Sequence, residues 1–324
     1  MMKKPKTLLC CVIVIVVNVI VAVSVFSFLF GKKDFSSEQK EKGRLIGASY
    51  MTMNNEFYKI IGEEVSYRVE AEGDRLILRD PALNPERQAE QIEDMLDMGI
   101  KALIVAPADS GCLREVLKKA KEQGVYIVVV DTAVEDGIPA DCTITSDNYK
   151  AGVLVGEHYL SEHESASLVI MTHESARSAR ERVAGFVDTV SQNPDIHIVR
   201  EIECEGQVEI AMPKMQEAID EGLMFDSVFC LNDLASVGIV AALDENGILD
   251  QVDVYGVDAS PDSKALIYEG MMDATAAQFP TLIGKRVADT VYDLLDGKEV
   301  QDALIPVKLV TQNNVEEFGI SRWQ

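Results

Sequence analysis

Apolar, β-branched runs alternate with amphipathic stretches along most of this chain. Examples of the apolar runs are 126–130 and 228–231, each followed by a polar residue. Buried strands of parallel sheets are nearly continuous apolar runs, whereas helices packed on them show a 3.6-residue period. The alternation therefore predicts right-handed βαβ units and parallel sheets.

The pattern divides into two consecutive series. The first predicts strands at 44–50, 75–79, 101–106 and 125–130, with helices at 57–71, 85–98 and 111–123. The second predicts strands at 142–145, 167–171, 196–203, 226–231, 251–257 and 273–277, with helices at 149–162, 176–192, 210–221, 234–246 and 262–269. A helix at 280–295 and a strand at 304–309 follow. We therefore predict an α/β protein with two doubly wound, parallel-sheet lobes.

Several of the predicted strands end in a short polar side chain. Asp131, Asn232, Asp258 and Gln278 each follow an apolar run. Ligands of open parallel sheets bind just outside the carboxyl ends of the strands. Carboxylates and carboxamides there suit a polyhydroxylated molecule, because each hydroxyl both donates and accepts hydrogen bonds.

Eight short segments, in this order, resemble a known family: Asn54-Asn55-Glu56-Phe57-Tyr58, Pro107-Ala108-Asp109-Ser110, Val130-Asp131, Ser146-Asp147-Asn148 with Ala151-Gly152, Ser178-Ala179-Arg180-Glu181-Arg182 with Gly185-Phe186, Asn232-Asp233, Gly256-Val257-Asp258 with Pro261-Asp262, and Gln278-Phe279-Pro280. From about residue 44 to 310 the sequence resembles the periplasmic sugar-binding proteins of the ribose-binding type. Their fold, the type I periplasmic binding protein fold, is shared by the effector domains of lac-repressor-like regulators. The resemblance implies two lobes, joined by three chain crossings, that close on a sugar by a hinge motion.

Carried onto this sequence, the resemblance implies one lobe from 44–146 plus 279–308 and another from 147–278 plus 309–324. It implies a ligand site with two walls. In the first lobe the site residues are Asn55, Phe57, Tyr58 and Asp131; in the second lobe or the hinge they are Arg182, Asn232, Asp258 and Gln278. Taken singly, the aromatic residues also suit a core, the aspartates a turn and the arginine a helix surface.

Three positions depart from the family pattern. Thr132 stands where the family carries an arginine, Gly206 where it carries an aromatic residue, and Glu56 where it carries a proline. We therefore do not identify the ligand as ribose. We expect Thr132 and Gly206 to leave space for a larger or differently substituted sugar.

The N-terminal residues 1–31 predict a membrane segment. Leu8 to Phe30 is mostly apolar and, at about 1.5 Å per residue, is long enough to cross a hydrocarbon core of about 30 Å. We favour a retained anchor with an exported body over a cleaved signal, although Ala22-Val23-Ser24 suits cleavage. The polar stretch 32–43 predicts a tether. The expected location is extracytoplasmic, either membrane-attached or, after cleavage, secreted or periplasmic.

Composition narrows the function classes. The formal net charge of −24 opposes nucleic-acid binding, and the membrane segment occupies the place of a repressor's DNA-binding motif. The sequence has no phosphate-binding glycine loop, GxSxG or HExxH motif, and its histidines and cysteines lack zinc-site spacing. We therefore predict no enzyme activity, no cofactor and no metal.

The leading prediction is an extracytoplasmic receptor that captures a monosaccharide-like sugar and delivers it to the permease of an ABC importer. The alternative keeps the receptor but makes its partner a membrane sensor histidine kinase. The sequence leaves open which sugar is bound, whether the anchor is cleaved, the oligomeric state and any disulfides.

Overall fold

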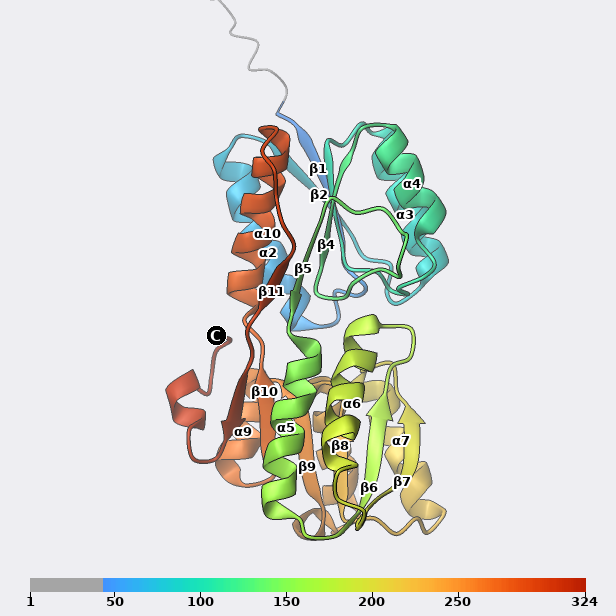
Figure 1. Ribbon diagram of the computed structural model, residues 1–324, viewed down its shortest axis with the longest axis vertical. Coiled ribbons are helices and arrows are strands. Elements are labelled where there is room, and N and C mark those ends of the chain that lie inside the picture. The colour runs from blue at the N-terminus through green and yellow to red at the C-terminus, as the bar shows by residue number, and fades with distance from the viewer. Residues whose placement is uncertain (1–42) are drawn as a thin grey trace, which may run out of the picture. The chain divides into compact units, whose positions relative to one another are not determined.

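The computed structural model describes residues 43–324, which contain two six-stranded sheets (Figure 1). The predicted membrane segment and all but the last residue of the tether lie outside the described residues. Among residues 43–324, none of the helices combines the length and hydrophobicity that crossing a bilayer requires. The predicted α/β architecture with two parallel-sheet lobes is confirmed.

The first sheet has the strand order β11-β5-β4-β3-β1-β2. Helices α2 and α10 pack together on one face, and α3 and α4 cover the other (Figure 1). The bounds are β1 Leu45–Ser49, α2 Glu56–Ala71, β2 Arg75–Arg79, α3 Pro85–Asp97, β3 Ala102–Val105, α4 Arg114–Glu122, β4 Tyr126–Val130, β5 Cys142–Ser146, α10 Pro280–Leu295 and β11 Ala303–Ile305.

The second sheet repeats this arrangement with the order β12-β10-β9-β8-β6-β7. Helices α5 and α6 pack against each other, as do α7 and α8. The bounds are α5 Asn148–Glu162, β6 Ala166–Thr172, α6 Arg177–Val190, β7 Ile196–Glu203, α7 Val208–Asp220, β8 Ser227–Cys230, α8 Asp233–Glu245, η1 Leu249–Gln251, β9 Asp253–Asp258, α9 Pro261–Glu269, β10 Ala274–Ala277, β12 Lys308–Thr311 and η2 Val315–Phe318.

The chain passes between the two sheets three times: after β5, after β10 and after β11. We propose these crossings as the lobe boundaries and call the elements of the two sheets the first and second lobe. The single strand predicted at 304–309 is wrong. Pro306 has no amide hydrogen to continue the ladder, so the segment divides into β11, parallel to β5, and β12, antiparallel to β10.

Two glycines let α5 and α6 cross with their backbones in contact. A Cβ at Gly152 would lie 1.9 Å from the carbonyl oxygen of Arg182, and a Cβ at Gly185 would lie 2.0 Å from that of Tyr149. No larger residue fits at either position. This contact, supported by the stacked rings of Phe186 and Phe229 beneath it, fixes the helix that carries Arg182.

The C-terminal segment beyond η2 connects the two lobes. The buried ammonium of Lys264, in α9, donates to the carbonyl oxygens of Phe318, Gly319 and Arg322, which holds the segment on the second lobe. Its Trp323 reaches the first lobe, where Nε1 donates to Glu56 Oε2 over 3.1 Å.

Candidate functional site

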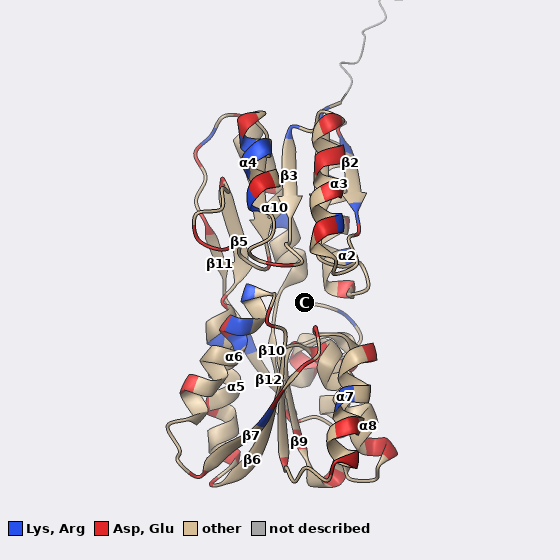
Figure 2. Ribbon diagram, turned by 90° about the vertical axis from the view of Figure 1, so that its right-hand side faces the viewer, with Lys and Arg blue, Asp and Glu red and all other residues tan. Residues whose placement is uncertain are grey.

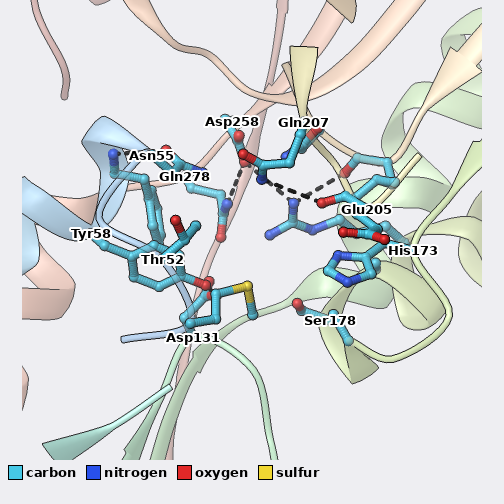
Figure 3. A pocket seen from close by; sticks show the side chains of 17 residues that line it. Thr52, Asn55, Tyr58, Asp131, His173, Ser178, Glu205, Gln207, Asp258 and Gln278 are labelled. Atoms are coloured by element: carbon cyan, nitrogen blue, oxygen red, sulfur yellow. Dashed lines mark hydrogen bonds and ion pairs between the residues drawn. The ribbon is translucent and has the colours of Figure 1, made fainter. Parts of the chain in front are cut away.

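One pocket lies between the carboxyl ends of the two sets of strands, and it encloses about 430 Å³ of empty space, counting its mouth (Figure 3). Residues from both lobes line it, and they include all eight of the predicted site residues: Asn55, Phe57, Tyr58, Asp131, Arg182, Asn232, Asp258 and Gln278. The structure therefore brings the predicted residues together, and their role in binding stays a prediction.

Asp131 follows β4 at the floor of the first lobe's side of the pocket. Its φ of +66° is in the left-handed region, which is uncommon for a residue with a Cβ and is often associated with functional sites. Tyr58 donates to its Oδ2 over 2.6 Å, whereas Oδ1 is buried without a hydrogen-bond partner. Burial raises the pKa of Asp131, although the positive charge of Arg182 acts to lower it.

Asp258 ends β9, the strand of the second sheet that corresponds to β4. It too has a positive φ, +138°. Its Oδ1 accepts from Gln278 Nε2 over 2.6 Å and from Arg182 Nη1 over 3.3 Å. Burial raises the pKa of Asp258 to about 7 despite the opposing effect of Arg182. The carboxylate therefore changes its charge state near neutral pH.

Arg182 extends from α6, and its side chain is buried. Nε donates to Asn148 Oδ1 over 2.8 Å, and Nη1 donates to the carbonyl oxygen of Leu231 over 3.1 Å as well as to Asp258. These partners hold the guanidinium plane rigidly. An arginine fixed in this way is suited to donate to ligand oxygens without losing side-chain entropy on binding.

The two predicted asparagines also cap helices. Asn55 Oδ1 accepts from the amide of Phe57 at the start of α2, and Asn232 Oδ1 accepts from the amide of Ala235 in the first turn of α8. Asn232 Nδ2 also donates to the carbonyl oxygen of Gly206. Capping uses the oxygen of each side chain, so the groups left for a ligand are N–H donors.

The aromatic residues pack mainly on one another. Tyr58 stacks on Tyr50 with ring centroids 5.8 Å apart, and Phe57 meets Tyr58 edge-on at 5.5 Å. The hydroxyl of Tyr58 positions Asp131, as described above. Any contact of the two rings with a ligand stays a prediction, whereas the hydroxyl of Tyr58 has a defined contact within the site.

Sequence reasoning missed several lining residues, including Thr52, His173, Ser178, Glu205 and Gln207 (Figure 3). His173 follows β6, and Glu205 and Gln207 follow β7, so they obey the strand-end rule that identified the others. The bounds of β7 agree with the predicted strand, but the strand is mostly exposed, so no buried apolar run leads to Glu205 and Gln207. Burial lowers the pKa of His173, which keeps its imidazole neutral at pH 7.

Contacts across the mouth of the pocket join the lobes at the start of α6. The helix has no capping side chain of its own, because its N-cap residue is Ala176. Instead, the amide of Arg177 donates to Ser110 Oγ over 2.9 Å and that of Ser178 donates to Thr132 Oγ1 over 3.0 Å. Figure 2 shows basic residues gathered at this end of α6. The described structure is therefore a closed one, in which the first lobe caps a helix of the second.

The space expected from Thr132 and Gly206 is not found. Thr132 is buried and bonded to α6, and neither residue lines the pocket. A Cβ at Gly206 would lie 2.8 Å from Asn232 Nδ2, because the asparagine fills that region. The expectation that these two positions leave space is therefore wrong, and a larger or differently substituted sugar stays a prediction without that support.

The described residues include no group of three or more histidine, cysteine, aspartate or glutamate side chains able to hold a metal ion. The pocket instead offers hydrogen-bond donors and acceptors fixed before a ligand arrives.

Comparison with known proteins agrees with this geometry. A family model described as a periplasmic binding protein domain matches residues 46–299. A ribose import binding protein of Bacillus subtilis is 27% identical over 280 residues, which cover 86% of this chain and 90% of that protein. A Caulobacter myo-inositol binding protein solved with myo-inositol is 25% identical, has a TM-score of 0.79, and the match covers 84% of this chain and 95% of that one. An ABC transporter solute binding protein from Bacillus halodurans, solved with myo-inositol, shares the fold with a TM-score of 0.82 at 23% identity, over 88% of this chain and 100% of that one.

Proposed function

We propose, from the premise that this chain belongs to the periplasmic binding protein domain family, that it captures a monosaccharide-sized polyol between its two lobes and delivers it to an ABC importer. The observation that carries the proposal is the convergence of eight polar and aromatic residues from both lobes on one buried pocket. The relatives described above are named as import or solute binding proteins rather than enzymes.

The chemistry of the pocket supports a polyol ligand. Asp131 and Asp258 provide carboxylate acceptors, Arg182 provides a fixed donor, and Gln278 provides a carboxamide oxygen that is buried without a partner. Each charge-assisted hydrogen bond contributes about 1.5 to 3 kcal/mol. Neighbouring hydroxyls of a sugar or cyclitol ring match this alternation of donors and acceptors.

Titration calorimetry with D-ribose, D-allose and myo-inositol tests the binding part of the proposal. We expect micromolar or tighter binding to a member of this panel or a close polyol relative, and weaker binding by an Arg182→Met variant. Flat heats for every polyol would refute the proposal.

Transport in proteoliposomes that contain the cognate permease tests the delivery part. Uptake that requires the binding protein is the expected result. The sensor-kinase alternative predicts ligand-dependent kinase activity instead, but the relatives compared above are named for import or ligand binding.

A further inference from the structure

The charges that line the pocket do not balance. Asp131 and Asp258 are buried acidic residues and Glu205 is an exposed one, whereas Arg182 is the one basic lining residue apart from His173, whose pKa is lowered by burial. Asp131 and Asp258 are 4% and 3% exposed, so water screens them poorly. A buried site with more carboxylates than cations favours a ligand that brings positive charge.

The negative charge that lacks a counter-charge is located at Asp131. Arg182 is committed to Asn148, Leu231 and Asp258, so its contact neutralises Asp258. Within residues 43–324 no lysine, arginine or histidine forms an ion pair with Asp131, and its side-chain partner is the neutral hydroxyl of Tyr58.

The unpaired atoms point to the same kind of ligand group. Asp131 and Gln278 both line the pocket, and each has a buried oxygen, Oδ1 and Oε1 respectively, that lacks a hydrogen-bond partner. Both atoms are acceptors, so the ligand groups that face them must donate. An ammonium has three donors, no acceptor and a positive charge, whereas a hydroxyl donates but leaves a buried carboxylate without a counter-charge.

We infer that the ligand is an amino-substituted polyol, such as an amino sugar or an aminocyclitol, whose ammonium binds Asp131. This inference rests on the proposed function, because it assigns the chemical class of the ligand at the same site. The remaining hydroxyls bind Arg182, Asp258 and Gln278 in the manner already described.

Matched ligand pairs that exchange one hydroxyl for an amine provide the test. We would titrate the protein at pH 7 with D-glucosamine and D-glucose, D-galactosamine and D-galactose, and scyllo-inosamine and scyllo-inositol. The expected result is that the amine of at least one pair binds about tenfold or more tightly than its hydroxyl parent, as expected for one charge-assisted contact worth about 1.4 kcal/mol.

An Asp131→Asn variant tests the assigned contact. Asparagine adopts left-handed backbone conformations readily, so the variant keeps the local geometry. We expect it to lose the preference for the amine, so that the two members of a pair bind with similar affinity and both bind more weakly than the amine binds to the wild-type protein. Glu63→Gln, a change on the exposed face of α2, is the matched control and should keep the preference.

Proton release gives a second readout that needs no variant. Burial raises the pKa of Asp258 to about 7, so this carboxyl is partly protonated at pH 7, and a cation that enters the site lowers its pKa and releases protons. Calorimetry in buffers of different ionisation enthalpy measures this release, which a neutral polyol should not produce.

The outcomes separate this inference from the proposed function. Binding of the hydroxyl member as tightly as the amine in every pair that binds would overturn the inference and leave the proposed function standing. An amine preference that persists unchanged in Asp131→Asn would overturn the assignment to Asp131. Absence of binding by any polyol, with or without an amine, would refute both.

Discussion

The cap that the first lobe supplies to α6 should set how tightly the protein holds its ligand. Ser110 and Thr132 are 1% and 0% exposed, and neither lines the pocket. Their hydroxyls accept from two backbone amides of the other lobe only while the lobes are closed. Replacing both, as Ser110→Ala with Thr132→Val, removes these bonds and keeps the side-chain volumes similar.

The size of the effect follows from capping energies. Loss of an N-cap hydroxyl costs about 0.5 to 2 kcal/mol, typically about 1 kcal/mol. Two hydroxyls thus shift the balance between open and closed forms by about 2 kcal/mol, which is a factor of about 30. The ligand needs the closed form, so a smaller closed population weakens binding. The dissociation constant should rise by up to about 30-fold, and the full factor applies when the open form predominates in the unliganded protein.

Calorimetry with a bound polyol, together with small-angle scattering of the unliganded protein, measures both effects. Asn84→Ala is the matched control, because Asn84 caps α3 through the amide of Arg87 within one lobe. It should lower the melting temperature without changing affinity. Unaltered affinity in the double variant would show that the trans-lobe cap has no role in closure.

Three further predictions concern single residues. Arg182→Met should weaken ligand binding by about 2 to 4 kcal/mol in calorimetry. It should also lower the melting temperature, because it leaves Asp258 buried without its ion pair. Glu63→Gln should change neither the affinity nor the melting temperature. Gly206→Ala should destabilise the fold by about 1 to 2 kcal/mol in denaturant titrations, because φ there is +62° and the new Cβ would crowd Asn232; wild-type stability would contradict this. The unliganded protein should melt at a lower temperature at pH 8 than at pH 5, and Asp258→Asn should reduce the difference. The pKa of Asp258 is about 7 in the folded protein against an ordinary value of 3.8, so the stability that its protonation contributes is lost as the pH rises to and through 7.

The sequence predicted the order of elements because buried parallel strands and amphipathic helices have distinct periods. The predicted strand at 196–203 matches β7, and most other elements match within a few residues. The error at 304–309 arose because the chain is mostly apolar on both sides of Pro306, with Lys308 the one charged residue from Leu304 to Val310, so hydrophobicity does not mark the transfer of the chain between sheets. The transfer is revealed only by the strands with which β11 and β12 pair, and these are distant in sequence.

The sequence predicted which residues form the candidate site and at which strand ends several of them lie. Asp131 and Asp258 stand at equivalent strand ends, so the rule for parallel sheets finds both. The rule does not say how their side chains pair. Arg182 contacts Asp258 rather than Asp131 because of the way in which α5 and α6 cross. Thr132 bonds α6 rather than lining the pocket because of the way in which the two lobes approach each other. Both are consequences of tertiary packing.

The anchored C-terminal segment gives this protein a built-in optical reporter. Trp323 is the single tryptophan of the chain, and it lies with its ring 5.9 Å from that of Phe57 while its indole nitrogen bonds Glu56. Its backbone is fastened to one lobe and its side chain touches the other. Swinging the lobes apart transfers the indole from a packed, hydrogen-bonded setting into water, so intrinsic fluorescence follows the motion without any attached dye.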